Sequence, residues 1–140
     1  PGYMAPGSHT AAAGLVAPEL QIADETAVAA YVRFMRSAVE AGFGAFVPEF
    51  GRRDMQFDFA ALERVADRPD ALVAQVFARL LGPRLHAALG REVLAAVQSV
   101  AVPELNRSAS NQPAIARAHR DRVRVALLLT LASPEYIVQL

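Results

Sequence analysis

Residues 125–132 have the sequence VALLLTLA, and this stretch decides the fold. It is the second half of a helix that we expect from about Ala114 to Ala132, whose first half carries Arg117, Arg120 and Arg124 on one face. A helix that is apolar on nearly every side is buried on nearly every side. We therefore expect this helix to begin in solvent and to pass into the centre of the core.

The last eight residues, SPEYIVQL, predict one further helical turn after this helix. Ser133 is a good N-cap, and Pro134 suits the first helical position because its missing N–H has no intrahelical partner there. Glu135 is favoured near the positive end of the helix. The long helix should therefore end at about Ala132.

The first helix of the chain is expected from about Asp24 to Ala41. Asp24 is a good N-cap, and Gly42 is typical of a helix end. Apolar residues at helical spacing form one stripe along this segment, made by Val28, Tyr31, Val32, Met35 and Val39.

Three more helices are predicted between these two. They are expected at about 57–66, at 69–81 with Pro69 in its first position, and from near His86 to about 102. A start at Pro83 is an alternative for the last of them. Residues 43–51 are expected to form a loop.

The first 18 residues contain three Pro and three Gly, a composition that interrupts regular structure. We therefore expect an irregular lead-in over residues 1–23 and a helical domain over residues 24–140. The predicted fold class is all-α, with about five helices packed as an orthogonal or irregular bundle.

Composition excludes several classes of function. A chain of 140 residues has the length of a single domain, and its formal net charge of zero argues against a nucleic-acid binder. The chain has no Cys, which excludes disulfides and thiolate metal sites. Its longest nearly apolar run, Val125–Ala132, is far shorter than the roughly 18 residues that span a bilayer, so we expect no membrane span.

The three histidines, His9, His86 and His119, give no metal-binding pattern. No two of them have the i, i+4 spacing that places two imidazoles on one helix face. Solvated or helix-capping histidines are the favoured interpretation. We therefore expect neither a metal site nor a cofactor site from these residues.

Glu19, Asp24 and Glu25 are close in sequence around the start of the first helix. Paired carboxylates can carry out acid–base chemistry or bind a hard cation. Acidic residues near a helix N-terminus also stabilise the helix, and this structural interpretation is favoured. The arginine face made by Arg117, Arg120 and Arg124 could grip a phosphate or a carboxylate, but a solvated face is again favoured.

Two long stretches resemble the C-terminal region of a large bacterial family, domain-of-unknown-function family 1800. They are AAAGLVAPELQIADETAVAAYVRFM (Ala11–Met35) and DRVRVALLLTLASPEYIVQL (Asp121–Leu140). The shared features are a GLVAPE-Q step, a helix ending in FM and a closing ASPEY-VQ. The segments DRPDALVAQVFARLL and LHAALGREVLAAV are similar to the family's two middle helices. The resemblance therefore covers nearly the whole chain.

The resemblance implies that this chain is the C-terminal fragment of a larger bacterial protein. Members of the family are usually much longer, and many look like exported proteins with N-terminal signals, which implies an exported or periplasmic location. No activity comes with the family. Glu19, Glu25, Glu135 and Tyr136 match its motifs and are therefore the candidate binding residues.

Two functions of different classes fit these observations. The first is a non-catalytic helical module that packs on the missing N-terminal region of the same protein. In the alternative, Glu19 and Glu25 contribute a wall of a hydrolase-like or metal-assisted active site located mainly upstream. Nucleic-acid binding through the arginine face is a third possibility, against which the zero net charge argues.

Overall fold

The computed structural model describes residues 25–84 and 86–138 of the chain. The chain divides into two units, Pro1–Phe34 and Met35–Leu140. Of the first unit, the structure describes only the beginning of helix α3 (Glu25–Ala41). The last turns of α3 and all further elements belong to the second unit.

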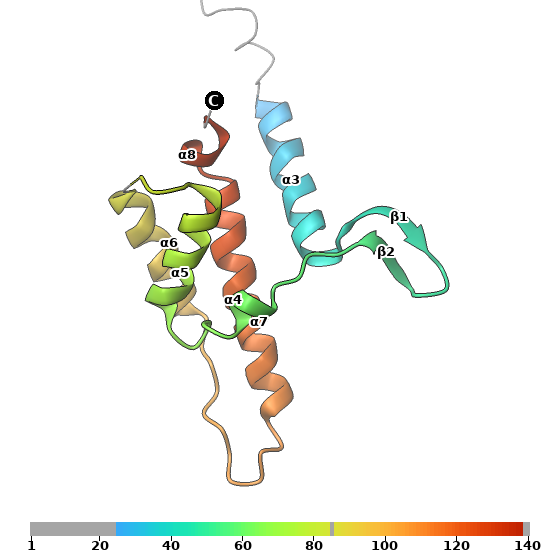
Figure 1. The fold of residues 1–140 in the computed structure, drawn as a ribbon, viewed down its shortest axis with the longest axis vertical. Helices are drawn as coiled ribbons and strands as arrows, with labels where there is room; N and C mark the ends of the chain where they lie inside the picture. The colour runs from blue at the N-terminus through green and yellow to red at the C-terminus, as the bar shows by residue number, and fades with distance from the viewer. Residues whose placement is uncertain (1–24, 85, 139–140) are drawn as a thin grey trace, which may run out of the picture. The chain divides into compact units, whose positions relative to one another are not determined.

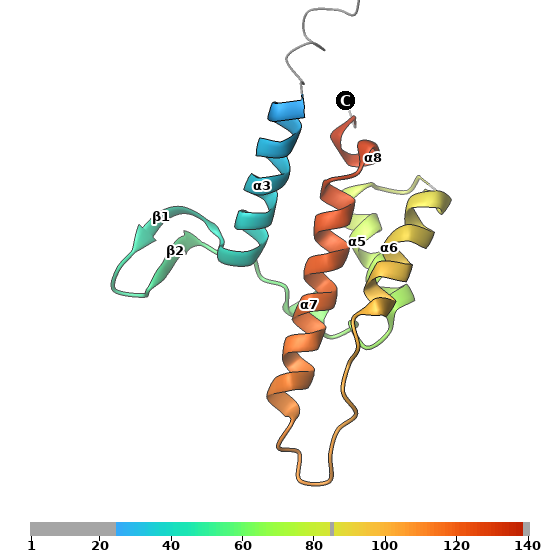
Figure 2. The ribbon, with the colours of Figure 1, turned by 180° about the vertical axis from the view of Figure 1, so that it is seen from behind.

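The described residues form six helices and one two-stranded antiparallel sheet (Figures 1 and 2). The elements that follow α3 are β1 (Phe43–Val47), β2 (Arg52–Met55), α4 (Ala60–Glu63), α5 (Pro69–Leu80), α6 (Ala87–Ser99), α7 (Gln112–Leu131) and α8 (Pro134–Ile137). The four long helices lie close to the predicted ranges. The mainly helical class is therefore confirmed.

Helix α7 is the central element of the second unit, because α4, α5, α6 and α8 all contact it. Three helices supply the largest fully buried side chains, which are Leu72, Val76, Val93, Val97, Val123 and Thr130. The hydroxyl of Thr130 donates to the carbonyl of Ala126 at 2.7 Å, so this buried polar group is satisfied. The predicted passage of the last long helix into the core is confirmed.

The burial of α7 differs from the prediction at both ends. Leu129 is 41% exposed, so the apolar half of the helix is covered on most sides rather than on all. In the charged half, Ala118 is buried and Arg122 is partly buried. The charged half therefore does not lie wholly in solvent, because carbonyls outside the helix hold Arg122.

Residues 43–55 form a β-hairpin where the sequence predicted a loop, so the all-α prediction is wrong in this part of the chain. Gly42 ends α3 with a φ of 76° and lets the chain reverse. A turn between the strands is closed by the N–H of Phe50, which donates to the carbonyl of Val47 at 3.1 Å. Aromatic and β-branched residues in FGAFV favour a strand, and the neighbouring Gly and Pro residues masked that preference.

The helix predicted at 57–66 is much shorter than expected, and only α4 is helical there. Phe57 stacks on Phe59, with ring centroids 5.7 Å apart, instead of beginning a helix. The carboxylate of Asp58 accepts the N–H of Ala60 at 2.9 Å in a local turn directly before α4, whose N-cap residue is Phe59. Beyond α4 the chain continues in hydrogen-bonded turns.

The ends of the other helices follow local signals. Helix α6 begins directly after His86, which confirms the predicted start there and makes the alternative start at Pro83 wrong. It ends at Ser99, earlier than predicted. Helix α7 begins at Gln112, slightly before the expected Ala114.

The final helical turn is confirmed as α8. The hydroxyl of Ser133 accepts the N–H of Tyr136 at 3.3 Å and donates to the carbonyl of Thr130 at 2.7 Å. Pro134 is the first residue of the turn, as predicted. The predicted lead-in and the first N-cap fall within residues 1–24, which lie outside the described residues.

Arg122 of α7 joins distant segments of the second unit through backbone carbonyls. Its Nε donates to the carbonyl of Val100 at 3.0 Å, just after the end of α6. Its Nη1 donates to the carbonyl of Ala66 at 2.9 Å and, at 3.5 Å, to that of Asp67. Carbonyls at helix ends lack intrahelical donors, so the guanidinium supplies the bonds that these turns need.

We predict that Arg122→Met lowers the free energy of unfolding by about 2–4 kcal/mol, because partly buried carbonyls lose charge-assisted bonds. Urea denaturation measures this change. The matched control is Arg117→Met on the exposed side of the same helix, for which a change below about 0.5 kcal/mol is expected. Equal destabilisation by both variants would contradict the structural role of Arg122.

Candidate functional site

An apolar cavity of about 350 Å³ opens in the second unit. The end of α3, the segment before α4, and helices α5, α7 and α8 contribute to its walls, which include Met35, Val39, Phe57, Phe59, Leu80 and Tyr136. Asp58 and Arg79 are the charged residues that line it. A mainly apolar cavity of this size with a few polar groups is typical of a binding site.

Three phenylalanines connect this cavity with the hairpin, and we name them the aromatic row. Ring centroids are 5.7 Å apart between Phe43 and Phe57, and again 5.7 Å apart between Phe57 and Phe59. Phe59 packs against the hydrophobic core, whereas Phe57 is 48% exposed. The row therefore runs from the core to the base of β1.

A β-bulge gathers the apolar side chains of the hairpin on one face. Phe43 pairs with Met55 and Phe46 pairs with Arg53, with a register shift between the two pairs. Residues 53 and 55 are two positions apart and share a face. Phe43 and Phe46 are three positions apart and would lie on opposite faces of a regular strand, but the extra residue of the bulge returns both to one face.

This arrangement leaves large apolar side chains in solvent. On the face defined by Phe43, Phe46 and Met55, which we name the apolar face, Phe46 is 61% exposed and Met55 is 51% exposed. Neither strand has a buried residue, so no described element covers the hairpin. A contiguous patch of exposed apolar side chains commonly marks an interaction surface.

The hairpin is tied to α3 at its base, and both of its edges carry features that hinder pairing with a further strand. The side-chain amide of Gln56 donates to the carbonyl of Ala41 at 3.0 Å and to that of Arg53 at 3.1 Å, which ties β2 to the end of α3. The edge of β1 carries the bulge, and β2 carries the charged sequence Arg52–Asp54. Bulges and charges are features that hinder the addition of a further strand.

The structure separates the candidate residues that the sequence suggested. Tyr136 lines the apolar cavity. Glu135, its neighbour, lines a different groove between α6 and the end of α7, together with Glu92. Glu19 and the side chain of Glu25 lie outside the described residues, so their proposed role stays a prediction.

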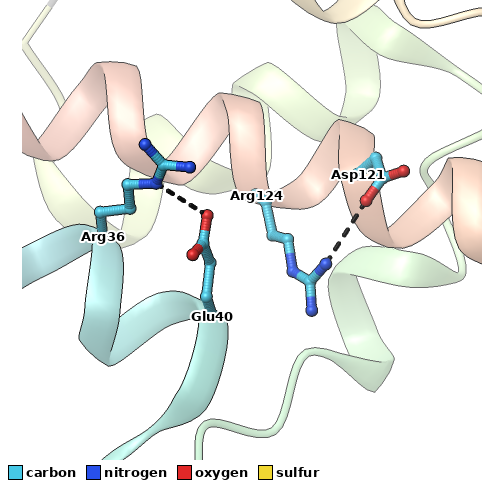
Figure 3. A network of polar contacts seen from close by, with 4 residues as sticks. All are labelled: Arg36, Glu40, Asp121 and Arg124. Carbon is cyan, nitrogen blue, oxygen red and sulfur yellow. Dashed lines mark hydrogen bonds and ion pairs between the residues drawn. The ribbon is translucent and has the colours of Figure 1, made fainter.

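The predicted basic face of α7 is partly neutralised (Figure 3). Arg124 pairs with Asp121 at 3.4 Å, and nearby Arg36 pairs with Glu40 at 3.0 Å. The other two arginines of the face are exposed. Exposed ion pairs of this type contribute little to stability, so this surface is best described as solvated.

The described histidines do not form a site. His119 is half-buried on α7, and the ring of His86 lies edge-on to Phe77, with centroids 6.4 Å apart. His9 lies outside the described residues. Within residues 25–84 and 86–138, no group of three or more His, Asp or Glu is placed to hold a metal ion. Over the same part of the chain, no helix has the length and apolar character that crossing a membrane requires.

The residues of the apolar face and the aromatic row were missed in the sequence, although a signal for them exists. Five of the seven Phe of the chain lie between positions 43 and 59. Aromatic residues are enriched in strands, so this clustering in a segment without helical periodicity favours strand structure there.

Comparisons of the chain with known protein families, with curated proteins and with solved structures find no match. The resemblance to domain-of-unknown-function family 1800 therefore stays a prediction, as do the bacterial and exported origins that it implies. What bears on function is the geometry of the cavity and the hairpin.

We predict that Gly44→Ala opens the hairpin. Gly44 has a φ of 90°, and a Cβ there would meet the carboxylate of Asp54. In Gly51→Ala, the matched control, φ is 61° and nothing lies within 4 Å of the added Cβ. Amide hydrogen exchange in β1 and β2 should be about tenfold faster in the Gly44 variant than in the Gly51 variant. Similar exchange rates in the two variants would argue against the close approach of Gly44 to Asp54.

Proposed function

We propose that this chain is a helical docking module that holds a segment of another polypeptide. The docking surface consists of the apolar face, the aromatic row and the apolar cavity. The observation that carries this proposal is their continuity, because Phe57 and Phe59 belong both to the row and to the cavity wall. Contiguous exposed apolar surface is the usual mark of a protein interaction site.

The extent of the surface favours a polypeptide over a small molecule. A small apolar ligand could fill the cavity, but Phe46 and Met55 on the hairpin would then stay exposed. A polypeptide segment can place one side chain in the cavity and cover the hairpin with others. Interfaces commonly have this form, with a buried anchor surrounded by further contacts that exclude water.

The stability of the hairpin gives a second reason to expect a partner on the docking surface. A two-stranded hairpin is at best marginally stable in water when nothing packs on its faces. Cover on the apolar face would bury Phe46 and Met55 and so stabilise both strands. The hairpin is therefore expected to become more ordered when the partner is present.

This function agrees with the first interpretation of the sequence, a non-catalytic module that packs on a preceding region of the same protein. That region is one polypeptide that could supply the docked segment. The active-site alternative depends on Glu19 and Glu25, whose side chains lie outside the described residues. It stays a prediction, and no observation on the described residues favours it.

We predict that a designed neutral peptide, about 18 residues long and helical with leucines along one face, binds the chain with a Kd of about 1–100 μM. Phe57→Ser should weaken this binding about tenfold, because it removes a large apolar contact at the centre of the surface. Isothermal titration calorimetry measures both values.

The matched control for this experiment is Leu105→Ser. Leu105 is 58% exposed, but it lies in the loop between α6 and α7 and does not line the cavity. Binding should be unchanged in this variant. Absence of binding at about 1 mM peptide, or equal weakening by both variants, would rule out the docking surface.

A further inference from the structure

We infer that the segment held on the docking surface is an amphipathic α-helix whose polar borders carry carboxylates. This inference rests on the proposed function and adds the conformation and the charge of the partner. Two observations carry it: the edges of the hairpin, and the two arginines of the docking surface that have no ion-pair partner among the described residues.

The edges of the hairpin favour a helix over a strand as the docked segment. A partner strand would have to pair with β1 at its bulge or with β2 along a charged sequence. The amide of Gln56 also occupies the carbonyl of Arg53 in β2. The side-chain face of the hairpin is therefore more accessible to a partner than its backbone edges, which is the mode by which amphipathic helices bind in grooves.

Arginines at the docking surface favour an acidic partner. Arg53 lies on the apolar face and Arg79 lines the cavity, and neither has an ion-pair partner among the described residues. Arg53 donates through Nη1 to the carbonyl of Gly44 at 2.7 Å, which leaves further N–H groups of the guanidinium. Asp58 also lines the cavity and offsets one of these positive charges, whereas Asp54 is on the opposite face of β2, so one positive charge is left in excess on the docking surface.

These charges give the docking surface a positive excess, with Arg53 opposite Phe46 on the apolar face and Arg79 at the cavity. Complementary charge raises the association rate and selects among partners with similar apolar faces. Carboxylates on a docked helix could pair with Arg53 at the hairpin and with Arg79 at the cavity. A helix bordered by lysines would instead meet the excess positive charge of the docking surface, and its binding would be weakened.

The test uses the full chain and three designed peptides with the same leucine stripe, whose borders carry Gln, Glu or Lys. We expect the Glu peptide to bind about tenfold more tightly than the Gln peptide at low salt, and the Lys peptide to bind more weakly than both. The advantage of the Glu peptide should largely disappear at about 0.5 M salt, because exposed charges are screened.

Charge-reversal variants test whether Arg53 and Arg79 cause the preference for the Glu peptide. The double variant Arg53→Glu, Arg79→Glu should prefer the Lys peptide over the Glu peptide. The control is Arg91→Glu, an exposed position on α6 that does not line the cavity, and it should keep the original order. Urea midpoints show whether each variant is folded. If the double variant unfolds, Arg53→Gln and Arg79→Gln are each expected to reduce the preference for the Glu peptide.

The outcomes separate this inference from the proposed function. If the three peptides bind equally well, the charge inference is wrong and the docking module stands. If none binds, the docking module itself is wrong. If the chain forms a concentration-dependent dimer that Phe57→Ser abolishes, the surface is occupied by a second copy, and the inference of an acidic helix is overturned.

Discussion

The guanidinium of Arg122 is the contact on which the arrangement of the second unit depends. It donates to carbonyls that are 22, 55 and 56 residues away in sequence, one after α6 and two after α4. The planar guanidinium has several fixed N–H donors and stays charged, so one side chain can serve several acceptors at once. Within the described residues, α7 thereby holds the ends of two other helices in place.

The docking surface depends on this arrangement through α4. Arg122 fixes the turn after α4, and Leu62 of α4 is buried in the core and lines the apolar cavity. The aromatic row lies directly before α4 and ends at Phe59, which packs on the same core. Leu127 and Leu131 of α7 complete the inner wall. Core packing and the proposed site are therefore parts of one structure.

The sequence predicted the helices well because each long helix has local signals. Apolar residues repeat at helical spacing in all four, and Ser133 marks α8 without any help from tertiary contacts. Arg122 could not be distinguished from Arg117 or Arg120, because its role comes from carbonyls that are far away in sequence. Tertiary packing, rather than a local pattern, decides which arginine is structural.

The hairpin and the site were missed for a related reason. Gly42, Gly44 and Pro48 are typical of loops, and their presence outweighed the short apolar stretch between them. The shared face of Phe43 and Phe46 depends on a one-residue bulge, which alternation alone does not predict. Of the four candidates taken from family-like motifs, Tyr136 lies at the cavity and Glu135 does not.

The docking surface is the central claim, and mapping of amide chemical shifts in the complex with the neutral peptide tests it most directly. We expect the largest shift changes over residues 43–59, around Leu80, and at Tyr136, because these backbone groups surround the apolar face and the cavity. Shift changes concentrated on the α6–α7 loop or on the exposed side of α6 would contradict the account.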